Sequence, residues 1–172
     1  VPNARVRRGG ICGATEARVS DRARAPSLLP QIVGDVGEKG CACHACEGAR
    51  AIVPELPAAT AEDFATEWLD AVLNVAVVDG VENALDHIVQ FGSSHTEAIV
   101  TSDESVAIRF MNGVSSAVVM WNASTQFCDG GEFGFGAEIG IATGRFHARG
   151  PVGVEQLTTF RYEVIGNGQV RA

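Results

Sequence analysis

The chain has 172 residues, of which 46% are hydrophobic and 20% are charged, proportions that are typical of a single globular domain. Its net charge of −8 argues against nucleic acid or an anionic membrane as the main partner, because either would be met by a broad excess of lysine and arginine. The sequence has no apolar run near the ~20 residues needed to cross a bilayer and no hydrophobic core of a signal peptide, so it predicts a cytoplasmic protein.

The opening segment carries Cys12 in the sequence RRGGICGATE, which runs from Arg7 to Glu16. Nearby guanidinium groups favour the thiolate, and glycines leave room for a substrate carbonyl beside the sulfur, so the pattern predicts a nucleophile. Six of the thirteen basic residues lie in the first 24 positions, which indicates either a site for an anionic substrate or a solvated face. A small buried thiol with no chemical role is the alternative that the local pattern leaves open.

From Thr15 onward, strand-like apolar runs alternate with amphipathic segments, as in βαβ units with a mostly parallel sheet. The first part predicts, in order, a strand, a helix and a second strand at Ala17–Ser20, Ala25–Val36 and Cys41–His44. A further helix is expected to begin after Thr60, with Thr60 as its N-cap and acidic residues in its first turn.

The residues Val72–Val78 form a nearly continuous apolar run, the pattern of a strand buried on both faces. Asp79 and Glu82 predict a capping box for the next helix, which should end at Gly92. That helix is expected to present four apolar residues on one side, namely Val81, Leu85, Ile88 and Val89.

The next elements are a strand at Ala98–Val100, a helix capped by Thr101 with Glu104, and a buried strand at Ser116–Trp121. The glycine-rich stretch from Asp129 to Gly153 then predicts a loop with one short helix near Glu138 to Thr143.

The last segment, Thr158–Ile165, alternates with a period of two, as a half-exposed strand does. It has no obvious partner within the chain, so it is a candidate for pairing outside this core, including with another subunit. The chain begins with Val1, and its arginine-rich opening has no clear helix or strand pattern. We therefore expect it to be the C-terminal part of a longer protein.

Several stretches resemble the γ-glutamyl phosphate reductase family, also called glutamate-5-semialdehyde dehydrogenase, of the aldehyde dehydrogenase superfamily. The most specific one, Val78–Ile99, reads V-x5-A-L-x-H-I-x-x-F-G-S-S-H-T-E-A-I. Asn122–Phe127 and Gly130–Gly140 are similar to a second family block, which His147–Pro151 continues. The resemblance covers essentially the whole chain and is weakest from Asp21 to Pro57.

The resemblance implies an α/β, three-layer catalytic domain with a mostly parallel sheet and a C-terminal oligomerisation strand. Residues 1–125 would form the domain of the catalytic thiol, residues 126–155 a glycine-rich return, and residues 156–172 a strand for subunit pairing. The main cofactor domain would lie before Val1, so the chain alone is expected to lack reductase activity.

The resemblance also implies roles for individual residues. Cys12 would be the catalytic thiol, and Glu67 would hold the nicotinamide ribose. The substrate contacts would come from the second family block, from Asn122, Ser124 and Thr125. The Cys12 backbone N–H is one expected donor to the developing oxyanion. No metal is implied.

The implied reaction is the reduction of L-glutamyl 5-phosphate by NADPH in proline biosynthesis. The thiolate would expel phosphate and form a thioester, and hydride transfer would then give glutamate 5-semialdehyde. The implied partners are this small-molecule substrate, further copies of the same chain in a homo-oligomer, and glutamate 5-kinase. Another acyl-phosphate or aldehyde dehydrogenase of the same superfamily is the alternative, and a non-catalytic partner domain is a further one.

A zinc-binding or interaction module is a separate hypothesis. Its four soft ligands lie within six residues, at Cys41, Cys43, His44 and Cys46. A short extended segment does not easily wrap one zinc ion, because tetrahedral sites usually draw pairs of ligands from two separated loops. The odd number of cysteines and this crowding do not resemble a secreted disulfide framework, so we expect reduced thiols.

Some remaining features are expected to play no part in the chemistry. Glycines at 134, 136 and 140 match part of a dinucleotide-binding fingerprint, but they lie inside a glycine-rich return rather than between a strand and a helix, so we reject that site. His87 should be structural, and His95 and His147 stand at family-like positions. Gln126 and Cys128 depart from the family pattern, in which an arginine and a small polar residue are expected.

Overall fold

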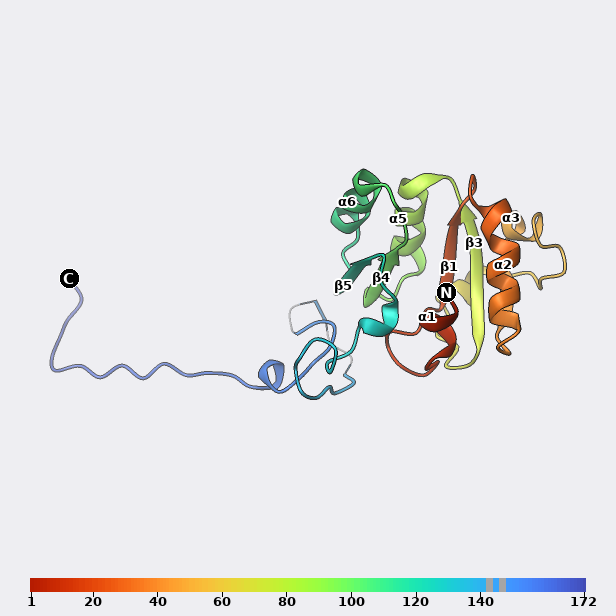
Figure 1. The fold of residues 1–172 in the computed structure, drawn as a ribbon. Helices are drawn as coiled ribbons and strands as arrows, with labels where there is room; N and C mark the ends of the chain where they lie inside the picture. Colours follow the sequence, from red (N-terminus) through yellow and green to blue (C-terminus); the bar gives the residue numbers. More distant parts are fainter. Residues whose placement is uncertain (142–143, 146–147) are drawn as a thin grey trace.

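The computed structural model describes residues 1–141, 144–145 and 148–172, which form a packed body and an extended C-terminal tail (Figure 1). The five strands of the body are all paired in parallel and make two separate sheets. The first sheet has the order β1-β3-β2, from β1 (Ala17–Asp21), β2 (Ala42–Ala45) and β3 (Val72–Val78). The second pairs β4 (Thr96–Ile99) with β5 (Val118–Trp121).

Among the described residues, six helices pack around the strands. They are α1 (Pro2–Val6), α2 (Ala25–Gly37), α3 (Glu47–Arg50), α4 (Ala61–Ala65), α5 (Gly80–Phe91) and α6 (Glu104–Gly113). Two short 3-10 turns follow them, η1 (Thr125–Phe127) and η2 (Glu155–Leu157). Helices α2 and α3 cover one side of the first sheet, while α5 lies between the two sheets and packs against α6 (Figure 1). The α/β class, the mostly parallel pairing and helices α2, α4, α5 and α6 are as the sequence predicts. Helix α1 lies in the opening segment, where no helix was expected, and α3 was not predicted.

The main core lies between the first sheet and helices α2 and α3. Leu29 and Val36 of α2 pack there against Leu73 and Val75 of the central strand β3, and the exposed fraction of each of these four side chains is 0%. Burial of a leucine or valine side chain stabilises the fold by about 1.5 to 3 kcal/mol. Strand β3 is central because both of its edges are paired, and this position explains its continuous apolar run.

The predicted helix starts are partly confirmed. Thr60 caps α4 in a capping box with Asp63, as expected. The predicted box of Asp79 and Glu82 is wrong, because each carboxylate pairs with a distant arginine instead. Asp79 binds Arg22, and Glu82 binds Arg109 of α6.

The carboxylate that accepts from the first turn of α5 belongs to strand β1. The backbone N–H of Gly80 donates to Oδ2 of Asp21, at the end of β1, over 3.0 Å. The cap of α6 also differs from the expectation, since Asp103 accepts from the N–H groups of Ser105 and Val106, while Oγ1 of Thr101 accepts from the N–H of Asp103. The cap of α5 thus comes from a neighbour in space, and the cap of α6 from a residue two positions after the expected one.

Two other predictions about helices are wrong in part. Val89 does not join the buried side of α5, because 83% of its side chain is exposed while Leu85 is buried. Residues 138–141 form no helix, and the remainder of the expected short helix lies outside the described residues. His147 also lies outside them.

The segment after η2 is extended and exposed. In the part of the chain that the structure describes, residues 159–172 belong to neither a helix nor a strand, and their hydrogen bonds join residues of this segment to one another. Figure 1 shows this tail leading away from the body. Its large apolar side chains, such as Tyr162 and Ile165, are 84% and 95% exposed.

Candidate functional site

The candidate nucleophile, Cys12, lies at the surface on a loop between α1 and β1, from Arg7 to Glu16, which we call the nucleophile loop. The turn around it is closed by a backbone hydrogen bond of 2.9 Å from Ala14 to the carbonyl of Ile11. Beyond the turn, the N–H of Thr15 donates to the carbonyl of Ala4 in α1 over 3.0 Å. The loop therefore has no helix or strand of its own, but its backbone is tied to the preceding helix.

The same loop packs against η1, which lies more than one hundred residues further along the chain. A Cβ atom added to Gly13 would lie 2.4 Å from the carbonyl oxygen of Thr125, so that a larger residue does not fit there. The hydroxyls of Thr15 and Thr125 are 2.9 Å apart and share a hydrogen bond. Gly13 is thus required for close approach between two backbones.

Gln126 completes this attachment. Its side chain is 3% exposed, and its Nε2 donates to the carbonyls of Ala4 and Arg8 over 3.1 and 3.3 Å. The neighbouring Ser124 donates from Oγ to Oδ1 of Asn3 over 2.7 Å. Since Gln126 departs from the family pattern, the chain uses an amide here to satisfy carbonyl groups of α1 and of the nucleophile loop.

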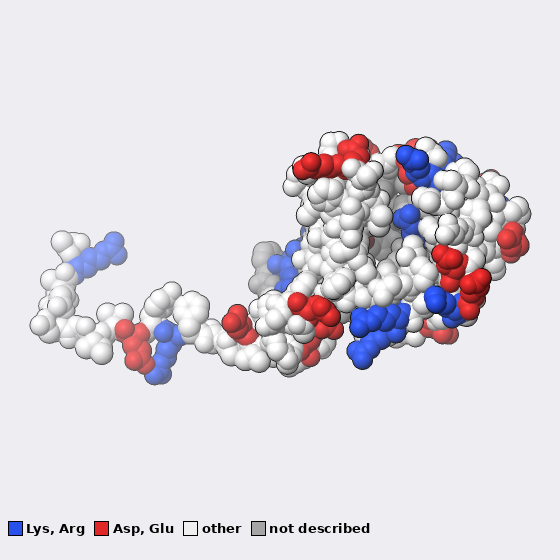
Figure 2. All heavy atoms as spheres, viewed as in Figure 1, with Lys and Arg blue, Asp and Glu red and all other residues white. Residues whose placement is uncertain are grey.

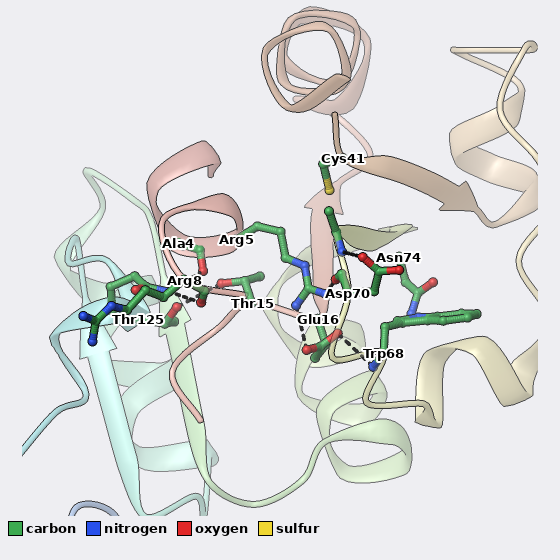
Figure 3. A network of polar contacts seen from close by, with 12 residues as sticks. Ala4, Arg5, Arg8, Thr15, Glu16, Cys41, Trp68, Asp70, Asn74 and Thr125 are labelled. Carbon is green, nitrogen blue, oxygen red and sulfur yellow. Dashed lines mark hydrogen bonds and ion pairs between the residues drawn. The ribbon is translucent and has the colours of Figure 1, made fainter. Parts of the chain in front are cut away.

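Arg5 holds the same loop through buried polar contacts (Figure 3). Its guanidinium is fully buried, pairs with Glu16 over 2.6 Å and also donates to the carbonyl of Asp70. The second oxygen of Glu16 accepts from the backbone N–H of Trp68 over 3.5 Å. A buried guanidinium that is already paired stabilises the loop and is not free to hold a substrate phosphate.

The cationic groups that remain near the loop are Arg7 and Arg8, both exposed. Figure 2 shows acidic and basic side chains interspersed over one face of the body, and the tail carries both signs as well. Near Cys12 the exposed arginines and the carboxylate of Glu138 have opposite signs, so the attraction of an anion depends on a few side chains rather than on a broad basic surface.

A carboxylate stands next to the thiol of Cys12. The Sγ–H donates to Oε1 of Glu138 over 3.6 Å, and the other oxygen of Glu138 accepts from the backbone N–H of Gly130. Desolvation together with the negative charge of Glu138 raises the pKa of Cys12 to about 11. The expectation that nearby arginines favour the thiolate is wrong for this arrangement, because the carboxylate is closer and favours the protonated thiol.

A second thiol, Cys128, ends the η1 turn and is only 1% exposed. Burial raises the pKa of Cys128, while hydrogen bonds from Thr96 and with Cys12 act in the opposite direction. The donor from Thr96 is Oγ1, which lies 3.0 Å from Sγ of Cys128. Cys12 and Cys128 are therefore neighbours although 116 positions separate them in the sequence.

Neither Glu138 nor Cys128 was identified as a site residue from the sequence. The signal available for Glu138 was its place in the glycine-rich family block, while Cys128 was visible only as a departure from the family pattern. Both come from the segment after β5, which folds back onto the nucleophile loop.

The other predicted site residues are divided between two places. Ser124 and Thr125 lie beside the nucleophile loop, as described above. Asn122 lies at the end of β5, where its Oδ1 accepts from the N–H of Thr101 and its Nδ2 donates to the carbonyl of the same residue. Those two contacts fasten the β4–α6 connection to β5, and the role of Asn122 towards a substrate stays a prediction.

Glu67 is exposed on the connection between α4 and β3. Among the described residues its carboxylate has no ion-pair partner, so it is available to accept hydrogen bonds from a ribose. The next residue, Trp68, is bonded to Glu16, which lies four positions after Cys12. The segment of Glu67 is thus connected to the nucleophile loop. The contact of Glu67 with a cofactor stays a prediction.

The side chains of the predicted zinc cluster do not converge, because strand β2 turns them to different sides. The side chains of Cys43 and His44 alternate across the strand: Cys43 enters the main core, whereas the His44 ring packs edge-on against Trp68 at 5.3 Å. Cys46 accepts a hydrogen bond from the backbone N–H of Val77. Burial raises the pKa of Cys43 to about 11, as for a structural thiol.

Over residues 1–141, 144–145 and 148–172, no three His, Cys, Asp or Glu side chains are grouped so that they could hold a metal ion. Within the same residues, no helix combines the length and the apolar character that a membrane span requires.

The fold has counterparts among solved structures. A propionaldehyde dehydrogenase of Rhodopseudomonas palustris superposes on 82% of this chain and 40% of its own, with a TM-score of 0.50 and 12% sequence identity. At this identity the likeness concerns the fold alone, which is that of an aldehyde-dehydrogenase-like catalytic domain. No family model matches the sequence.

Much stronger similarities define the family. A γ-glutamyl phosphate reductase of Gluconobacter oxydans is 71% identical over 169 residues, which are 98% of this chain and 40% of the relative. The crystal structure of the γ-glutamyl phosphate reductase of Thermotoga maritima has a TM-score of 0.93 and 44% identity, and it covers 99% of this chain and 41% of its own. The chain belongs to the γ-glutamyl phosphate reductase family and spans about 40% of the length of the curated relatives it matches.

Proposed function

We propose that a protein carrying this chain reduces L-glutamyl 5-phosphate to glutamate 5-semialdehyde with NADPH, through a thioester on Cys12. The family supports the reaction class, since curated relatives that are 71% and 66% identical to this chain are named γ-glutamyl phosphate reductases. The observation that carries the proposal is the surface thiol of Cys12 on a loop fixed from both sides, with an acceptor for its proton 3.6 Å away.

In the first half of the proposed reaction, Sγ of Cys12 attacks the acyl carbon and its proton passes to the carboxylate of Glu138. The bond between that carbon and the phosphate oxygen breaks, and phosphate leaves. The backbone N–H of Cys12 donates to the developing oxyanion. Because the loop is already ordered by Arg5, Gly13 and Gln126, little reorganisation is needed to place the sulfur.

When bound, NADPH supplies the hydride that converts the thioester to a thiohemiacetal. Glu67 is the residue of this chain that we propose to orient the cofactor, by accepting hydrogen bonds from the nicotinamide ribose. The thiohemiacetal then collapses, the carbon–sulfur bond breaks, and Cys12 is regenerated. Ser124 and Thr125 are proposed substrate contacts because they lie beside the nucleophile loop.

The proposal is tested in a full-length protein that contains this sequence, by the NADP⁺-dependent oxidation of glutamate 5-semialdehyde in the presence of phosphate. Cys12→Ser should lower kcat by about 10³-fold or more, because a serine hydroxyl is a far weaker nucleophile here. Cys46→Ser is the matched control, since a hydroxyl can also accept from Val77, and it should retain activity. Normal turnover of the Cys12→Ser protein would overturn the proposal.

The substrate and the role of the chain alone need separate measurements. A substrate panel of acyl phosphates and aldehydes distinguishes this activity from that of another member of the superfamily, because the protein should prefer the glutamyl compound to all others.

The 172-residue chain by itself is proposed to be acylated at Cys12 but not to turn over, since the chain spans only 40% of the length of its relatives. NADPH-dependent turnover by the chain alone would contradict this.

We further propose a division of the chain that follows its structure. Residues 1–125 form the thiol domain, residues 126–155 return across it, and residues 156–172 pair with another copy in a homo-oligomer. The exposed apolar residues of the tail support the last part. Glutamate 5-kinase as a partner and the cytoplasm as the location complete the proposal.

A further inference from the structure

Cys128 is a buried thiol for which the proposed reaction has no use. It lies in the backbone turn that supports the nucleophile loop: a Cβ added to Gly13 would be 3.4 Å from the carbonyl oxygen of Cys128. Its thiol accepts a hydrogen bond from Thr96, and Cys12 is among the groups that influence its pKa. Two free thiols, one at the surface and one buried, therefore lie near each other.

We propose that Cys12 and Cys128 form a disulfide when a peroxide oxidises the surface thiol of Cys12. This oxidation site is separate from the proposed reductase reaction, and its formation requires neither the acyl substrate nor the cofactor. The disulfide would remove the nucleophile reversibly and would spare it from further oxidation.

The chemistry proceeds in two balanced steps. The Cys12 thiolate attacks one oxygen of hydrogen peroxide, the O–O bond breaks and hydroxide leaves, so that sulfur is oxidised to sulfenic acid while the peroxide is reduced. The Cys128 thiolate then attacks the sulfenic sulfur, the S–S bond forms, and the S–O bond breaks with release of hydroxide. With the two thiol protons, the net products are one disulfide and two waters.

The surroundings assign different tasks to the two sulfurs. Cys12 is exposed and meets the peroxide first, whereas Cys128 is 1% exposed and protected from it. Burial raises the pKa of Cys128, and the hydrogen bond of 3.0 Å from Thr96 acts against this rise, so that it favours the thiolate fraction that attacks the sulfenic acid.

Closing the disulfide requires an S–S distance of about 2.05 Å, shorter than any hydrogen bond between thiols, so the nucleophile loop must shift locally. The loop has room to do so on its outer side, because no atom lies within 4 Å of a Cβ added to Gly10. Cys41, Cys43 and Cys46 lie in strand β2 or directly before and after it, at the far edge of the first sheet, and are not neighbours of this pair.

Peptide mapping of the intact folded chain tests the proposal directly. The chain is treated with about one equivalent of hydrogen peroxide, alkylated, and digested with trypsin without reduction. Cleavage places Cys12 in residues 9–18, Cys128 in residues 110–145, and the three remaining cysteines together in residues 40–50. The expected product is a linked pair of the first two peptides, which dithiothreitol separates.

Variants identify the resolving sulfur. Cys128→Ala should abolish the linked pair and, with a second equivalent of peroxide, let Cys12 proceed to sulfinic acid, whereas Cys46→Ala, the matched control, should leave the linked pair unchanged. Predominant linkage of Cys12 to residues 40–50, or the same yield of Cys12 sulfinic acid in the unsubstituted chain as in Cys128→Ala, would overturn the proposal. These products are read by mass and do not depend on whether the chain takes part in reductase activity.

Discussion

The nucleophile loop and the C-terminal tail both lack helix and strand, yet they differ in how their positions are determined. The loop from Arg7 to Glu16 is fixed by a buried guanidinium, a buried amide and a backbone contact at Gly13. Residues 159–172 have hydrogen bonds only within their own segment, in the part of the chain that the structure describes. Irregular backbone can therefore be as well determined as a strand when distant side chains satisfy its polar groups.

The largest expected effect comes from closing the space at Gly13. Gly13→Ala would place a methyl group 2.4 Å from the carbonyl of Thr125, so η1 and the loop must separate. We expect the free energy of unfolding to fall by about 2 to 3 kcal/mol, measured by urea denaturation. Gly10→Ala is the control and should change it by less than about 0.5 kcal/mol, since its Cβ meets nothing within 4 Å. Equal effects of the two would show that the contact does not fix the loop.

The same substitution, made at a side chain that holds the loop and at a side chain of the tail, sharpens the comparison. Gln126→Ala leaves the carbonyls of Ala4 and Arg8 without their amide donor, and should destabilise the fold by about 1 to 3 kcal/mol. Gln169→Ala removes contacts to Asn167 within the tail and should leave the free energy of unfolding unchanged. Urea denaturation of both variants provides the measurement, and a similar loss in the two would contradict the contrast.

A smaller effect is expected at the thiol. Glu138→Gln removes the negative charge that helps to raise the pKa of Cys12, so the pKa should fall below about 11 and more thiolate should be present at any lower pH. Alkylation of Cys12 by iodoacetamide at pH 8 should become about threefold to tenfold faster, and the midpoint of its pH profile should move down. Glu132→Gln, in the same glycine-rich stretch, should leave the rate unchanged. A slower reaction of Glu138→Gln would show that this carboxylate assists ionisation.

The smallest effect on the body is expected from removing the tail. Deletion of residues 159–172 should change the free energy of unfolding at low protein concentration by less than about 0.5 kcal/mol, because their side chains are exposed. Self-association, measured by sedimentation velocity at higher concentration, should be lost if the tail pairs subunits. A marked loss of stability of the dilute protein would mean that the tail packs on the body.

Most of the framework was predictable from periodicity. The run Val72–Val78 and the helices around Leu29 and Leu85 were correctly identified, because apolar spacing reports which face a regular element buries. The capping box at Asp79 was wrong, since Arg22 lies 57 positions away and no local pattern reveals it. Sequence therefore located elements better than it located their polar contacts.

The candidate site was predictable to a lesser extent. Cys12 was identified from its local sequence and from the family resemblance, but its neighbours Glu138 and Cys128 come from the return segment after β5. Their effect on the thiol depends on the fold, and reverses the influence expected from the nearby arginines. Local charge in the sequence is a poor guide to ionisation when a distant carboxylate is closer in space.

The two sheets have no strand ladder between them among the described residues, yet the nucleophile loop is fastened to both. The carbonyl of Glu16 accepts from the backbone N–H of Asn74 in β3, and the hydroxyl of the adjacent Thr15 is bonded to Thr125, just beyond β5. Any sliding of one sheet past the other therefore carries the sulfur with it. A ligand that contacts both sheets would therefore change the position of Sγ of Cys12 without contacting it.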